Sequence, residues 1–291
     1  MTETTGASPA AAPREAVVTD PQGVAVHVYV WDHPEPRAVV HVSHGVGEHA
    51  GRYGYVARAL HDAGYAVVAD DHRGHGATGE GHLGLGELGK GSHHAVFDAV
   101  EAVARQARSW YAPAPFVMLG HSWGSLVAQK LLARDPALFD GLVLSGTSYA
   151  LPGVINGGDL GKRFHVDGGT GFEWLSRDPA VGEAFAADPM TFDVNTHSPY
   201  RWWQALQLLG RPPRHLARDV PVLVQGGSDD SLGGVRGMTM LADAYRHRSG
   251  LTDVSLMIYP GARHEIYNET NKDEVLADLV AWLDARFGPR T

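Results

Sequence analysis

Short apolar runs alternate with longer amphipathic segments along most of the chain. Six of the runs have the length and the uninterrupted hydrophobicity of strands buried in a sheet. They are residues 38–42, 65–69, 115–119, 141–145, 220–225 and 254–259. Apolar positions at helical spacing mark residues 53–63, 92–111, 122–134 and 271–287. This alternation predicts an α/β fold, with a mostly parallel sheet flanked by helices on both faces.

The N-terminal end of the chain departs from this pattern. Residues 24–31 predict a strand that pairs as a hairpin with residues 15–19, across a turn at residues 20–23. Residues 1–14 are small, polar and rich in proline and alanine, which predicts a disordered tail. The tail lacks the basic and apolar parts of a secretory signal.

A second departure interrupts the middle of the chain. Residues 147–215 show no strand–helix repeat, and glycines at their start give way to aromatic residues. A stretch of this length without sheet-like order is more than a loop inside a compact domain. We predict a cap over residues 147–215, inserted into a core formed by residues 15–146 and 216–291.

Composition narrows the possible functions. The chain has 291 residues, of which 44% are hydrophobic and 20% charged, as in a globular domain with a large core. Its formal net charge of -9 disfavours nucleic acid as a partner. The absence of cysteine excludes disulfides and thiolate chemistry, and is consistent with the cytoplasmic location that we predict. No apolar run approaches the roughly 20 residues that a membrane span needs.

A candidate nucleophile lies between a predicted strand and a predicted helix. Residues 120–124 (GHSWG) fit the pattern G-x-S-x-G. The pattern builds a sharp strand-to-helix turn, in which glycines make room and the serine projects above the edge of the sheet. Ser122 would also lie at a helix N-terminus, which favours developing negative charge. We therefore predict Ser122 as a nucleophile rather than as a capping serine in an ordinary turn.

A serine nucleophile needs a base, and His264 is the best candidate. In hydrolases with this turn, the acid and then the histidine follow the serine in the chain. His264 follows a predicted strand and a Pro-Gly turn, which places it on a loop at the carboxyl edge of the sheet. The other downstream histidines lie in the predicted cap, before the acid's strand, or between two arginines on an amphipathic helix: His165, His197, His215 and His247.

The acid must reach the same edge of the sheet. The predicted strand at residues 220–225 is followed by Asp229 and Asp230. Either carboxylate can hold the imidazole in the required tautomer and stabilise the imidazolium. The other would close the loop as an Asx turn.

Attack of a serine on a carbonyl group leaves a negatively charged oxygen, the oxyanion, which needs two backbone N–H donors. Trp123, which follows the predicted nucleophile, supplies one. Val46 supplies the other from the glycine-rich loop at residues 44–49 (HGVGEH), where Gly45 lets the backbone approach a substrate carbonyl. The side chains of Val46 and Trp123 then shape the acyl site. The histidines and the glutamate of this loop do not form a zinc-binding HExxH motif, so no metal is predicted.

Five blocks of sequence resemble the monoacylglycerol lipase and lysophospholipase group of α/β-hydrolases, especially its bacterial members. The blocks are HGVGEHAGRY (44–53), DHRGHGAT (71–78), GHSWGS (120–125), GGSDDSLGG (226–234) and YPGARHEIYNE (259–269). The resemblance extends over residues 15–287 and includes part of the cap. It implies the α/β-hydrolase fold, a cap that forms an acyl tunnel, and cleavage of single-chain lipid esters without a cofactor.

The resemblance favours Asp230 over Asp229, because the group's catalytic aspartate ends a Gly-x-x-Asp unit and residues 227–230 fit it. The sequence departs from the group at two places. Trp123 follows the nucleophile where methionine is common. Residues 151–169 are polar and rich in glycine, where a leucine-rich membrane-docking helix is expected.

Together these observations predict a serine esterase that acts on a monoacylglycerol or a lysophospholipid through an acyl-enzyme. In the cap, Trp174, Trp202 and Trp203 are predicted to contact the acyl chain, with a small satellite core as the alternative. Peripheral membrane contact would also occur through the cap. The rival functions are a small-ester carboxylesterase, a proline-type aminopeptidase, an acyltransferase and a non-catalytic receptor on the same fold.

Overall fold

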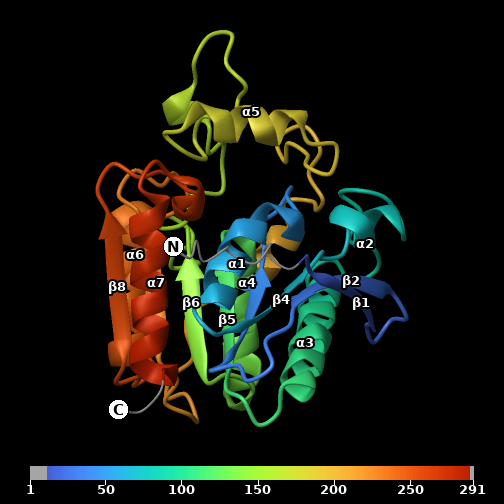
Figure 1. The fold of residues 1–291 in the computed structure, drawn as a ribbon. Coiled ribbons are helices and arrows are strands. Elements are labelled where there is room, and N and C mark those ends of the chain that lie inside the picture. Colours follow the sequence, from blue (N-terminus) through green and yellow to red (C-terminus); the bar gives the residue numbers. More distant parts are fainter. Residues whose placement is uncertain (1–11, 289–291) are drawn as a thin grey trace, which may run out of the picture.

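The computed structural model describes residues 12–288, which form an eight-stranded sheet with helices on both faces (Figure 1). The strands are β1 Arg14–Thr19, β2 Ala25–Trp31, β3 Val39–Ser43, β4 Ala66–Asp70, β5 Phe116–His121, β6 Gly141–Ser145, β7 Val222–Gly227 and β8 Val254–Tyr259. Their order in the sheet is β1-β2-β4-β3-β5-β6-β7-β8. β2 pairs antiparallel with β1 and with β4, whereas every pairing among β3 to β8 is parallel. The predicted hairpin and the mostly parallel sheet are both confirmed.

Side chains alternate along each strand, which gives the sheet two apolar faces. In β5, Phe116 and Met118 pack into one buried cluster, while Val117 and Leu119 pack into the other. The helices of the first face are α3 His93–Trp110, α4 Trp123–Arg134 and α6 Gly234–Asp243. Those of the second face are α1 Gly54–Asp62 and α7 Lys272–Phe287. The uninterrupted apolar runs of the sequence are therefore strands covered on both faces.

The carboxyl ends of the parallel strands meet at one edge of the sheet. Ser43 at the end of β3 pairs with Gly120 of β5, and the ends of β7 and β8 pair at Gly227 and Tyr259. The loops that follow these strands therefore converge on one small region.

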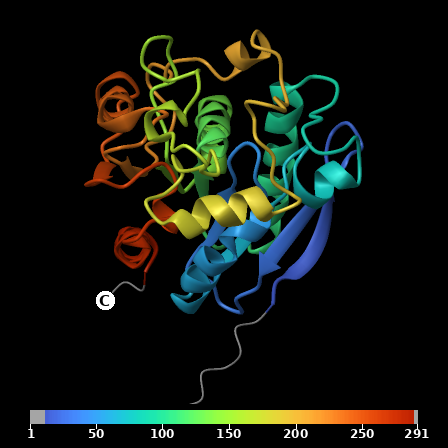
Figure 2. The same ribbon diagram turned by 90° about the horizontal axis from the view of Figure 1, so that it is seen from above.

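Residues 147–215, called the cap segment below, form most of the connection between the neighbouring strands β6 and β7. The segment contains α5 Pro179–Ala187 and short 3-10 turns at Lys162–Phe164 and Gln204–Gln207, and it contributes none of the eight strands. Figure 1 shows α5 above the carboxyl ends of the strands, and Figure 2 shows it from above, lying on the side of α1.

The predicted tail (residues 1–14) is outside the described residues except at its end, where β1 already begins at Arg14. The segment predicted as a helix from Ser122 begins one residue later, at Trp123. Within residues 12–288, no helix combines the length and the apolar character needed to cross a bilayer.

Candidate active site

Ser122 occupies a strained turn between β5 and α4. Its φ of 51° and ψ of -120° put a non-glycine residue in a region that L-amino acids rarely adopt. The flanking glycines are required by close packing. A Cβ atom on Gly124 would lie 2.1 Å from the carbonyl oxygen of Ser43, and one on Gly120 would lie 2.6 Å from the oxygen of Gly124. The turn therefore fixes where the Ser122 side chain emerges.

His264 and Asp230 come together beside this turn. His264 follows β8, and its Nδ1 donates a hydrogen bond of 2.8 Å to Oδ1 of Asp230, which follows β7. The N–H of Leu232 donates to the same oxygen and holds the carboxylate in place. Asp229 instead accepts a bond from Arg163 in the cap segment, and its side chain is 37% exposed. Of the two aspartates left open by strand order, the structure brings Asp230 to the imidazole.

The environment of His264 suits a base. Burial favours the neutral ring, but the carboxylates of Asp230, Glu265 and Glu48 together outweigh burial, so the pKa of His264 lies above its ordinary value. The buried Nε2 atom has no hydrogen-bond partner among the described residues. Ser122 and His264 line the same cavity, so Nε2 is available to accept the proton of the serine hydroxyl.

The loop after β3 presents backbone donors to the same space. The N–H of Gly45 donates to Glu48, and the N–H of Gly47 donates to Nε2 of His75 at 3.0 Å. Between them, the N–H of Val46 has no acceptor within the described part of the chain, and neither has the N–H of Trp123 at the start of α4. Val46 and Trp123 both line a cavity with Ser122, as an oxyanion site requires.

His75 helps to hold this loop. Burial lowers the pKa of His75 to about 3, so its ring is neutral near pH 7. Its Nδ1 donates to the carbonyl of Arg73, which leaves Nε2 as the acceptor for Gly47. The loop geometry thus depends on a buried neutral histidine.

Two cavities meet at Ser122. The large cavity, of about 720 Å³, is mostly apolar and includes Leu126, Ile155, Leu206, Leu208 and Leu232 in its lining. The small cavity, of about 50 Å³, includes Gly45, Glu48, His121, Phe185 and Glu265. Both are also lined by Val46, Ser122, Leu160, Trp174 and Val194. A substrate bond held at Ser122 would therefore separate a large apolar group from a small group that lies beside carboxylates.

The predicted substrate-binding residues do not all reach these cavities. Gly45 lines the small cavity, and Trp174 lines both, with its ring centroid 5.0 Å from that of His264. Trp202 lines the large cavity but is 76% exposed. Trp203 lines neither: it is 46% exposed and lies under the guanidinium of Arg201. The prediction for Trp203 differs from the structure because adjacent residues in an irregular segment point in different directions.

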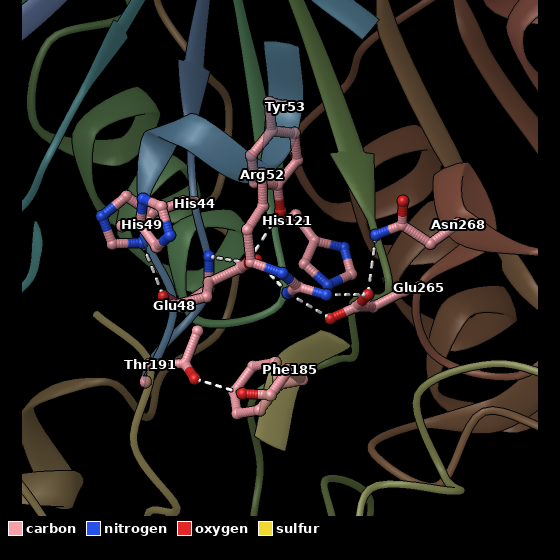
Figure 3. A network of polar contacts seen from close by, with 12 residues as sticks. His44, Glu48, His49, Arg52, Tyr53, His121, Phe185, Thr191, Glu265 and Asn268 are labelled. Atoms are coloured by element: carbon pink, nitrogen blue, oxygen red, sulfur yellow. Dashed lines mark hydrogen bonds and ion pairs between the residues drawn. The ribbon is translucent and has the colours of Figure 1, made fainter. Parts of the chain in front are cut away.

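Sequence reasoning missed a buried polar network beside the site (Figure 3). Arg52 lies between Glu48 and Glu265, and bonds both carboxylates at 2.6–2.7 Å. The only local signal is the spacing of Glu48 and Arg52, four residues apart. Nothing in the sequence relates Arg52 to Glu265, which lies 213 residues away.

Comparisons with known proteins identify the family and the fold. Residues 34–271 match the family described as "Serine aminopeptidase, S33". The chain is 34% identical over 275 residues to a protein of Mycolicibacterium smegmatis named monoacylglycerol lipase, in an alignment that covers 90% of this chain and 93% of the relative. It is 28% identical over 270 residues to human monoglyceride lipase, with coverage of 86% and 84%.

Among solved structures, a carboxyl esterase from Bacillus coagulans superposes with a TM-score of 0.81 at 24% identity, covering 95% of this chain and 99% of that one. This likeness concerns the fold alone, and it confirms the predicted α/β-hydrolase fold.

Proposed function

The chain belongs to the family described as serine aminopeptidase, S33, and is a hydrolase of acyl esters, and we propose that its substrates are monoacylglycerols. The observation that carries the proposal is the pair of unequal cavities that meet at Ser122: the large one is mostly apolar, and the small one carries carboxylates among apolar side chains. The relatives named monoacylglycerol lipase and monoglyceride lipase support the same substrate class.

In the proposed mechanism, Ser122 attacks the ester carbonyl while Nε2 of His264 takes its proton. Asp230 keeps the proton of His264 on Nδ1 and stabilises the imidazolium that forms. The N–H groups of Val46 and Trp123 receive the negative charge on the carbonyl oxygen. His264 then protonates the leaving alcohol, and water releases the acyl group by the same steps in reverse.

We place the acyl chain in the large cavity. Its leucine and isoleucine side chains offer an apolar surface, and transfer of each methylene from water contributes about 0.8 kcal/mol. The cap segment supplies much of this lining, including Ile155, Leu160 and Leu208, which supports its assignment as a cap over the site.

We place the alcohol in the small cavity. Three carboxylates, Glu48, Asp193 and Glu265, line it, and the guanidinium of Arg52 offsets one of their charges. The balance of three negative charges and one positive is -2. A phosphate-bearing headgroup would be repelled there, whereas a neutral polyol can donate hydrogen bonds. This charge favours a monoacylglycerol over a lysophospholipid.

A substrate panel on purified protein tests the proposal. We expect hydrolysis of long-chain monoacylglycerols, weaker hydrolysis of lysophosphatidylcholine and none of prolyl arylamides, and no turnover of any of them by Ser122→Ala. A preference for acetyl esters over long-chain esters would contradict the lipid assignment. Failure of the folded protein to react with a fluorophosphonate probe would contradict the catalytic assignment itself.

We also propose that the protein meets its lipid substrate at a membrane surface. Trp202, Trp203 and Leu206 are exposed apolar side chains of the cap segment, and two of them also line the large cavity. Exposed tryptophans favour the boundary between lipid and water. Sedimentation with phosphatidylcholine vesicles should fall in a variant with both tryptophans changed to alanine. The predicted cytoplasmic location stays a prediction.

A further inference from the structure

One arginine connects the two loops that carry the proposed catalytic groups. Arg52 lies in the 3-10 turn Ala50–Tyr53, directly after the loop that holds Val46. Its side chain is only 12% exposed and makes three charge-assisted hydrogen bonds, all to carboxylates. In Figure 3 its guanidinium lies between Glu48 on one side and Glu265 on the other.

On the oxyanion side, the network fixes the backbone through Glu48. Oε2 of Glu48 accepts from Arg52, while Oε1 accepts from the N–H of Gly45 at 2.6 Å and from the hydroxyl of Tyr53 at 2.8 Å. The N–H of Gly45 is the one immediately before the proposed donor at Val46. Any rotation of the Glu48 carboxylate would therefore turn the peptide next to the oxyanion donor.

On the other side, the network fixes the residue next to the proposed base. Glu265 accepts two parallel bonds of 2.7 Å from Arg52 and a third from the side-chain amide of Asn268. The bidentate geometry orients this carboxylate, and with it the backbone that continues from His264. The Arg52 guanidinium holds the pKa of Glu265 well below its ordinary value, so this carboxylate is charged near pH 7.

The same arginine also contacts the cap segment. Its guanidinium lies 4.8 Å from the ring centroid of Phe185 in α5. Nearby, His49 bonds Asp188 at the end of α5, and the N–H of Phe192 donates to the carbonyl of Gly47 at 2.9 Å. The oxyanion loop is thus held from the core and from the cap at once.

We propose that Arg52 is a positioning residue that sets the spacing between the oxyanion donors and His264 by bridging Glu48 and Glu265. This inference rests on the proposed roles of Val46 and His264. A misplacement of about 1 Å between reacting groups can lower a rate by about 10²-fold, so a bridge of this kind affects kcat more than binding.

The bridge also sets the charge around His264. The ionisable groups that face the imidazole are Asp230 after β7, His121 at the end of β5, Glu48 after β3 and Glu265 on its own loop. Both glutamates raise the pKa of His264, and Arg52 offsets one of their two charges. The net charge of the three bridge residues is therefore -1.

Three variants separate geometry from charge in the hydrolysis of p-nitrophenyl butyrate between pH 5 and 9. In Arg52→Met, kcat should fall about 10²-fold with little change in KM, and the acid limb of the profile should move to higher pH. Arg52→Lys keeps the charge without the bidentate fork, so the limb should stay in place while kcat falls less. Glu265→Gln removes one negative charge, so its limb should move to lower pH.

The double variant Arg52→Met/Glu265→Gln is the sharpest test. Its only remaining bridge charge is that of Glu48, so the net charge is again -1. We expect the acid limb to return to the wild-type position while kcat stays low. A loss of stability alone would not move the acid limb in opposite directions in Arg52→Met and Glu265→Gln, nor cancel the two shifts in the double variant.

The matched control is Arg105→Met, because Arg105 also bonds two carboxylates, Glu101 and Asp135, but lies at the surface on α3. Unfolding is followed by the melting temperature of each variant, and if Arg52→Met does not fold, the Glu265→Gln and Arg52→Lys profiles decide. If the Arg52 and Glu265 variants have the same kcat and the same acid limb as Arg105→Met, the proposal is wrong. An inactive wild-type protein would instead contradict the proposed function.

Discussion

The loops at the carboxyl edge of the sheet, called the rim below, enclose the same cavities as the cap segment, but the two regions are built differently. At the rim, Ser122, Asp230 and His264 are buried, and their loops are fixed by hydrogen bonds and by glycines that no larger residue can replace. In the cap segment, Val166, Trp202 and Leu206 are each more than half exposed. From this difference we propose that the rim determines whether the chemistry occurs, whereas the cap segment determines which acyl chains are accepted.

The largest expected effect comes from removing the nucleophile at the rim. Ser122→Ala should lower kcat on monoacylglycerols by about 10⁶-fold, because no other hydroxyl occupies the strained turn. Steady-state assays with glycerol release as the readout measure it. Residual turnover above one per cent of wild type would show that the rim does not carry the reaction in this way.

The two aspartates after β7 offer a direct contrast between rim and cap. Asp230→Asn should reduce kcat by about 10⁴-fold, because the amide favours the wrong tautomer of His264. Asp229→Asn keeps a hydrogen-bond acceptor for the exposed Arg163, so its kcat should stay within about twofold. Equal losses in both variants would contradict the assignment of Asp230.

The pH profile tests the electrostatics of the rim. His264 must be neutral to take the serine proton, and its pKa is raised above the ordinary value by Asp230. Activity should therefore be lost on the acid side with a midpoint above about 6.5, and fall about tenfold for each further pH unit. In the residual activity of Asp230→Asn, the midpoint should move to lower pH. A wild-type midpoint below that of a free histidine would contradict the predicted direction.

The smallest effect is expected in the cap segment. Trp202→Ala removes part of the lining of the large cavity, so kcat/KM for palmitoyl esters should fall by a few-fold, or about 1 kcal/mol. Trp203→Ala is the matched control, because Trp203 lines neither cavity. Short-chain esters should be unaffected by either change. A loss in both variants with butyryl esters would mean that the cap segment affects the chemistry itself.

The fold could be predicted well because its signals are local. Each buried strand is an uninterrupted apolar run. The G-x-S-x-G turn can be identified because its motif lies between an apolar strand and an amphipathic helix. The order of strands then brings Ser122, Asp230 and His264 to one edge, which explains why three residues far apart in the chain could be chosen together.

What could not be predicted depends on long-range contacts without a local pattern. The bridge from Arg52 to Glu265 joins residues 213 positions apart. From the sequence alone, an arginine or a glutamate is expected to lie at the surface in contact with water. The cap segment lacks periodicity, so neither the direction of Trp203 nor the contribution of Leu160 to both cavities follows from the residues alone.

The cap segment lies in the connection between β6 and β7, which are adjacent parallel strands of the sheet. Insertion at such a point costs little loop-closure entropy, and strand pairing does not depend on what is inserted. A different segment in this connection would therefore change the lining of the large cavity without changing the order of the strands. Any replacement segment would still have to hold the oxyanion loop, as the N–H of Phe192 does by donating to the carbonyl of Gly47.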